Sequence, residues 1–140
     1  MKNMLFIAVC LFGATAVFGC GKGFVGLGGQ VTYSDNGEPL ECGTVSLTNG
    51  SIQARGEIGK DGKYVIGSLV ARDGLPPGPY RVCVANAVKK LWDPNDDFLT
   101  EPLIDVKFTD PNTSGLTLNV DASTKNKFDF QVDRYVPSKK

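Results

Sequence analysis

Carboxylate and amide oxygens recur at alternate positions in Asp93-Pro94-Asn95-Asp96-Asp97, as they do in a calcium-binding loop. The segment lacks the turn glycine of such a loop, and the twelfth loop position is Ile104 rather than a glutamate. Pro94 further restricts the backbone. We therefore predict no metal and interpret the segment as a solvated acidic loop.

The absence of histidine limits the catalytic chemistry that the chain can perform. None of the 140 residues is histidine, which removes the commonest general base and the commonest zinc ligand. Ser-His or Cys-His nucleophilic catalysis is therefore impossible within this chain. A small hydrolase using paired carboxylates stays open as an alternative, although no acidic residue lies in a stretch typical of a cleft floor. We predict that the protein is not an enzyme and has no cofactor.

The aromatic residues raise a second alternative, a carbohydrate-binding module. Tyr33, Tyr64 and Tyr80 are in phase with aliphatic residues, which predicts that they are buried. Trp92 and Tyr135 are left as the aromatic residues available for stacking on a sugar.

A surface segment over residues 88–102 interrupts the regular pattern of the chain with acidic residues and two prolines. We predict that Trp92, Asp96 and Asp97 form an interaction surface there, because loops on a rigid scaffold commonly carry recognition. The loop from Asp110 to Gly115 is a further candidate.

The first 19 residues have the features of an export signal. Lys2 is followed by an unbroken apolar run from Met4 to Phe12, which is too short to span a bilayer. Val17-Phe18-Gly19-Cys20 resembles the lipobox of bacterial lipoproteins, with Phe18 as a departure. The resemblance implies cleavage before Cys20 and a diacylated thioether on it, with chains such as palmitate.

Cleavage after Ala14-Thr15-Ala16 is the competing interpretation, and it would give a secreted protein without lipid. We expect an extracytoplasmic address on either interpretation. With lipid, the chain would be anchored to the cell envelope, at the outer membrane where there are two. The expected partners are the membrane and an unknown envelope protein or polysaccharide. The full chain has 15 basic and 15 acidic residues, which gives no electrostatic reason to expect nucleic acid.

Period-two alternation of apolar and polar residues predicts half-buried strands along the exported part. We expect an all-β antiparallel Greek-key sandwich of about seven strands. The predicted inward side chains are Val31, Val45, Leu47, Tyr64, Ile66, Tyr80, Val82, Val84, Leu118, Phe128 and Phe130. The predicted divisions are a signal at 1–19, a lipidated Cys and Gly-rich tether at 20–28, a sandwich at 29–133 and a basic tail at 134–140.

Short motifs in the exported part resemble carboxypeptidase regulatory-like domains, which have a transthyretin-like (prealbumin-like) sandwich. The opening of such a domain is matched by 29–33, 37–40 and 43–47, and the pattern continues in Asp61-Gly62-Lys63-Tyr64 and 77–82. Two further segments, 107–116 and 126–130, resemble the C-terminal half of small bacterial lipoproteins with this domain. The resemblance implies a fold and an extracytoplasmic address, and assigns no functional residue.

Two cysteines remain once Cys10 leaves with the signal and Cys20 carries lipid. In an oxidising compartment Cys42 and Cys83 would be free to form a disulfide. Alternation places both on outer faces, so the bridge requires that their strands be neighbours.

We predict that the mature chain begins at Cys20 and carries lipid, because the lipobox-like residues precede a glycine-rich stretch. Mass spectrometry of the protein from the membrane fraction measures both the mature start and the added mass. An unmodified chain that starts at Val17 would contradict the prediction and favour the Ala14-Thr15-Ala16 site.

Overall fold

The computed structural model describes residues 23–91, 99–122 and 126–138, and this part of the chain is all-β apart from one short 3₁₀ turn. The strands are β1 (Leu27–Tyr33), β2 (Thr44–Thr48), β3 (Gln53–Glu57), β4 (Lys63–Val65), β5 (Gly78–Ala85), β6 (Val88–Leu91), β7 (Leu99–Pro102), β8 (Leu116–Val120), β9 (Asn126–Lys127) and β10 (Phe130–Val132); the turn η1 (Val106–Thr109) lies before β8. None of the described residues forms a helix long and apolar enough to cross a membrane.

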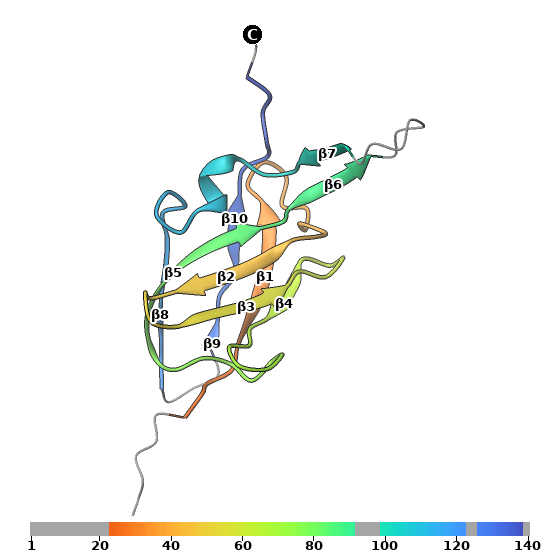
Figure 1. Ribbon diagram of the computed structural model, residues 1–140. Helices are drawn as coiled ribbons and strands as arrows, with labels where there is room; N and C mark the ends of the chain where they lie inside the picture. The colour runs from red at the N-terminus through yellow and green to blue at the C-terminus, as the bar shows by residue number, and fades with distance from the viewer. Residues whose placement is uncertain (1–22, 92–98, 123–125, 139–140) are drawn as a thin grey trace, which may run out of the picture.

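Two sheets pack face to face around one hydrophobic core (Figure 1). One sheet has the order β3-β2-β5-β8, and the other places β1 between β4 and the C-terminal strands β9 and β10. The predicted inward side chains are buried, except that Leu118 and Phe128 pack against the core while partly exposed. The alternation in the sequence therefore identified the inner faces correctly.

The prediction of a wholly antiparallel sandwich was wrong for the strands beside β1. β1 runs parallel to β10, with Val31 opposite Phe130, and parallel to β9. The described part of the chain also contains ten strands rather than about seven, because short strands such as β9 lie beside longer ones. Alternation indicates which residues form strands, but the direction of pairing depends on where distant segments meet.

The ordered domain extends beyond both predicted boundaries. Val25, which we assigned to the glycine-rich tether, forms a β-bridge with Leu75, and β1 begins at Leu27. At the other end Arg134, which we assigned to the tail, forms a bridge with Ile104. The chain that separates Cys20 from the folded domain is therefore shorter than the sequence suggested.

The sequences Asp35-Asn36-Gly37 and Lys60-Asp61-Gly62 are typical of turns that need a positive φ, and their glycines adopt it. Gly37 (φ 73°) and Gly62 (φ 77°) lie in the left-handed region that other residues rarely adopt. Gly62 also has no room for a side chain, since a Cβ there would lie 2.6 Å from the Val31 carbonyl oxygen.

Gly29 lets β1 approach the C-terminal segment closely. An added Cβ would lie 1.9 Å from the carbonyl oxygen of Phe128. The buried hydroxyl of Tyr64 donates a hydrogen bond to the same carbonyl oxygen at 2.5 Å. The absence of a side chain at Gly29 therefore permits Tyr64, on β4, to bind the segment between β9 and β10 on the far side of β1.

We predict that Gly29→Ala lowers the free energy of unfolding by about 1–3 kcal/mol, because the added methyl group collides with backbone that cannot move without separating β1 from Phe128. Chemical denaturation measures the change as a lower midpoint. Gly23→Ala is the matched control, since no atom lies within 4 Å of its added Cβ. Equal midpoints for the two variants would show that the close approach is unimportant.

Candidate interaction surface

β6 and β7 form a two-stranded ribbon that projects from the sandwich (Figure 1). Leu91 lies opposite Leu99 and Lys89 lies opposite Glu101. All these side chains are exposed, and among the described strands β6 and β7 pair only with each other. The ribbon therefore presents both side chains and free strand edges.

The base of the ribbon is fixed to the sandwich. Asn86, directly after the end of β5, adopts a positive φ of 56°, which turns the chain. The next residue, Ala87, is buried. The Leu103 amide then donates a hydrogen bond to the Ala87 carbonyl at 2.9 Å. An isolated two-stranded ribbon is only marginally stable in water, so this attachment gives β6 and β7 a defined direction.

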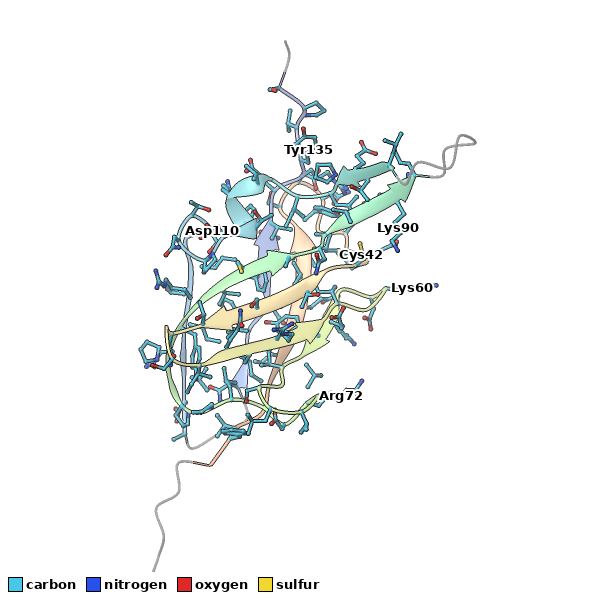
Figure 2. The ribbon with its side chains drawn as sticks, in the orientation of Figure 1. Cys42, Lys60, Arg72, Lys90, Asp110 and Tyr135 are labelled. Atoms are coloured by element: carbon cyan, nitrogen blue, oxygen red, sulfur yellow. The ribbon has the colours of Figure 1, made fainter. Side chains whose placement is uncertain are left out.

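The predicted interaction surface cannot be located on the described strands. Trp92, Asp96 and Asp97 fall between β6 and β7 in the chain and lie outside the described residues, as does Cys20. The exposed aromatic residue Tyr135 lies at the same end of the molecule as Lys90 of β6 (Figure 2).

Cys42 and Cys83 are free thiols, so the structure does not form the disulfide that we predicted. The register places Cys83 opposite Ser46, four residues from Cys42, which is about 13 Å of extended chain. A disulfide needs Cα atoms within about 7 Å. Cys83 lies on β5, which pairs with β2, but Cys42 precedes β2, and its thiol donates a hydrogen bond to the Val88 carbonyl oxygen at 3.5 Å.

The loop from Asp110 to Gly115 folds over the outer face of β5. The Ser114 hydroxyl donates to the Val82 carbonyl oxygen, and the Arg81 guanidinium donates to the Asn112 side-chain oxygen. Cys83 is buried on this face, and burial, together with the nearby Asp110, raises the pKa of its thiol. A thiol with a raised pKa is a weak nucleophile at neutral pH.

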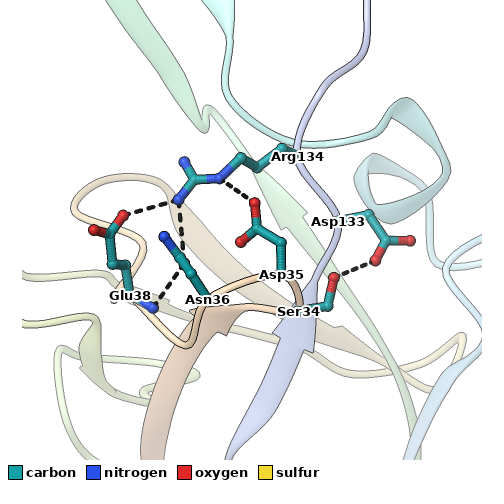
Figure 3. A network of polar contacts seen from close by, with 6 residues as sticks. All are labelled: Ser34, Asp35, Asn36, Glu38, Asp133 and Arg134. Atoms are coloured by element: carbon teal, nitrogen blue, oxygen red, sulfur yellow. Dashed lines mark hydrogen bonds and ion pairs between the residues drawn. The ribbon is translucent and has the colours of Figure 1, made fainter.

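A network of charged side chains joins the C-terminal end of the domain to the turn after β1 (Figure 3). Arg134 Nε donates to an Asp35 oxygen at 2.7 Å, and its Nη2 donates to Glu38 at 2.9 Å. The guanidinium carbon lies 3.7 Å from the centre of the Tyr33 ring, within the range of a cation–π contact. The hydrogen bonds from Arg134, first that to Asp35, raise its pKa.

Asp133 continues this network toward η1. It accepts hydrogen bonds from the Lys107 ammonium at 2.5 Å and from the Ser34 hydroxyl at 2.6 Å. These donors, Lys107 first, lower the pKa of the Asp133 carboxyl. The charged side chains of the network therefore pair with one another, and they hold Asp133 and Arg134 against η1 and the turn after β1.

A groove of about 910 Å³ lies along β3, β4 and the loop that follows β4. Side chains of both charges line the groove, and Val65 and Leu69 contribute exposed apolar surface; the charged residues are Arg55, Glu57, Asp61, Lys63 and Arg72. Our sequence interpretation did not identify this groove, because its walls come from the outer face of two strands and an irregular loop. The signal in the sequence that could have identified it is the apolar run Leu69-Val70-Ala71, which lies outside the alternating pattern of the strands.

In the described part of the chain no three His, Cys, Asp or Glu side chains gather as metal ligands would. Comparison of the chain with models of protein families, with curated proteins and with solved structures finds no significant match.

We predict that the Asp133 network makes the protein less stable in acid. A carboxyl whose pKa is lowered on folding contributes stability above its unfolded pKa, near 3.8, and loses that contribution as the pH falls through the lower folded value. Asp133→Asn should therefore reduce the loss of unfolding free energy between about pH 5 and pH 2. Denaturation at a series of pH values measures the slope.

Lys107→Gln is the matched variant for this network, because it removes the donor that lowers the pKa of Asp133 most. The double variant should show the same pH dependence as Asp133→Asn alone. An unchanged slope in all three variants would contradict the assignment.

Proposed function

We propose that the protein is a non-catalytic lipoprotein of the cell envelope that acts as a tethered interaction module, with the β6–β7 ribbon as its recognition element. One observation carries the proposal. The chain enters the domain at the lower end in Figure 1, whereas the ribbon projects near the upper end. A domain anchored through Cys20 would therefore present the ribbon away from the membrane.

The length of the tether supports this orientation. Phe24 lies four positions after Cys20 in the chain, a separation of at most about 14 Å when extended. Two acyl chains on Cys20 would hold the protein stably, whereas one chain anchors only marginally. The lower end of the domain would then stay close to the bilayer.

The chemistry of the ribbon favours a protein partner. Its free strand edges offer backbone donors and acceptors of the kind that pair with an added strand. The Leu91–Leu99 pair adds apolar contact area, and Lys89 and Lys90 add positive charge. A polysaccharide is the second candidate, and the 39% exposure of Tyr135 at the same end favours it.

The fold that we propose is the carboxypeptidase regulatory-like sandwich with Greek-key connections. It is supported by the short motifs in the sequence and by the arrangement of two packed sheets. The parallel pairing of β1 with β10 also supports the proposal, because it brings the segment that resembles the opening of such domains beside the segment that resembles their C-terminal half.

We predict that replacing Leu91 and Leu99 together by serine abolishes recovery of the partner protein, because it removes the exposed apolar pair of the ribbon. Cross-linking in intact cells, followed by affinity purification of the full-length protein, measures the recovered partners. A second variant, in which Trp92, Asp96 and Asp97 are replaced together, tests the residues that join β6 to β7 in the chain. Val65→Ser is the matched control, since Val65 is also exposed but lies on β4.

Unchanged partners in both ribbon variants would move the recognition site elsewhere. Turnover of a polysaccharide or peptide by the purified protein, abolished by removing one carboxylate, would overturn the non-catalytic assignment.

A further inference from the structure

The loop after β4 presents two large apolar side chains to solvent. Leu69 is 80% exposed and Val70 is 67% exposed. Neither side chain turns back into the core, although buried residues such as Ile66 and Leu75 lie directly before and after the loop. Clustered apolar residues held outward in this way indicate a surface that contacts something other than water.

Asp73 fixes the loop in this conformation. Its carboxylate accepts hydrogen bonds from the backbone amides of Ser68 at 2.6 Å, Leu69 at 3.1 Å and Val70 at 3.2 Å. Arg72, next to it, adopts a positive φ of 67°, which is uncommon for a residue with a side chain. The apolar tip, Leu69 and Val70, therefore has a defined backbone conformation that three hydrogen bonds to the Asp73 carboxylate stabilise.

The tip lies at the end of the domain where the chain from Cys20 enters. Val25 and Leu75 exchange backbone hydrogen bonds at 2.9 and 3.1 Å, so the segment after the loop runs beside the entering chain. Figure 2 shows Arg72 at this lower end, opposite Tyr135. Phe24, the residue before Val25, is itself 42% exposed, which adds a third apolar side chain at the same end.

Positive charge accompanies these apolar side chains. Arg72 lies two positions after Val70, and within the described residues neither Arg72 nor the neighbouring Arg55 takes part in an ion pair. Asp73 is the one acidic residue of this loop, and its carboxylate accepts hydrogen bonds from the backbone amides. Apolar side chains flanked by unpaired arginine match the boundary between acyl chains and lipid phosphates.

We propose that Phe24, Leu69 and Val70 insert into the surface of the lipid bilayer, with Arg72 at the level of the phosphates, as a second and non-covalent membrane contact. The proposal deepens the proposed function, because the lipid on Cys20 would place this end within about 14 Å of the bilayer. Together the two contacts fix how the domain stands on the membrane and keep the ribbon pointing outward. A free anchor alone would let the domain rotate.

Depth-dependent fluorescence quenching tests the contact. Trp92 is the only tryptophan of the chain, so a Trp92→Phe background leaves one reporter per variant. The Leu69→Trp protein, purified from membranes as the full mature chain, is mixed with vesicles of phosphatidylethanolamine and phosphatidylglycerol that contain brominated acyl chains. The matched control is Val106→Trp, because Val106 is 72% exposed in η1, at the other end of the domain.

We expect strong quenching and a blue-shifted emission for Leu69→Trp, and little change for Val106→Trp, since bromine quenches only groups that enter the acyl region. Adding Arg72→Gln should weaken the quenching and its dependence on anionic lipid. Equal quenching at the two positions would overturn the proposal. An emission shift of Leu69→Trp that depends on protein concentration without vesicles would also overturn it, because it would assign the surface to a second copy of the chain.

The mass of the same purified protein separates this inference from the proposed anchor. An acylated Cys20 with equal quenching at both positions would refute the bilayer contact and leave the anchor intact. An unmodified Cys20 with selective quenching of Leu69→Trp would refute the anchor and support the contact.

Discussion

β1 lies between β4 on one side and the two C-terminal strands on the other, so one sheet exists only when the beginning and the end of the domain meet. Val31 and Phe130, which are paired, are separated by 99 residues. Gly29 makes this meeting close enough for Tyr64 to bind the Phe128 carbonyl across β1. Contacts of such long sequence separation are expensive in loop entropy, so the core of the other sheet must stabilise them. The directions in which the ribbon and the entering chain leave the domain both depend on this closure.

Several charged side chains of the described residues hold loops in place. Asp73 binds three amides of the loop after β4, and Arg134 joins the C-terminal segment to the turn after β1. Asp133 binds Lys107 and Ser34. A carboxylate that accepts several hydrogen bonds is stabilised in its charged form and is a poor general acid at neutral pH. The surfaces that these loops leave exposed, the ribbon and the apolar tip, are the parts of the described chain that we assign to recognition.

The two proposed contacts lie at opposite ends of the domain, and the sandwich between them is rigid. β1 runs from the lower end of the molecule toward the upper end (Figure 1), and it packs on a core in which Val31, Val45 and Val82 are fully buried. Because such a core resists deformation, an orientation set at the membrane would be transmitted to the ribbon without a flexible joint. The short chain between Cys20 and Val25 would also limit how far the domain can reorient relative to the membrane.

The sequence by itself determined the all-β class, the residues of the inner faces and the glycine turns, because alternation and positive φ are local properties of the chain. It also indicated that 88–102 departs from the sandwich, as the ribbon does. Only the tertiary structure decided that β1 pairs in parallel with β10, since period-two alternation is the same for either direction. The structure likewise decided that Cys42 and Cys83 lie apart, because a bridge depends on register, which single strands do not encode. Only the tertiary structure showed that Leu69 and Val70 are exposed, because the hydrogen bonds from their amides to Asp73 form only in the folded loop.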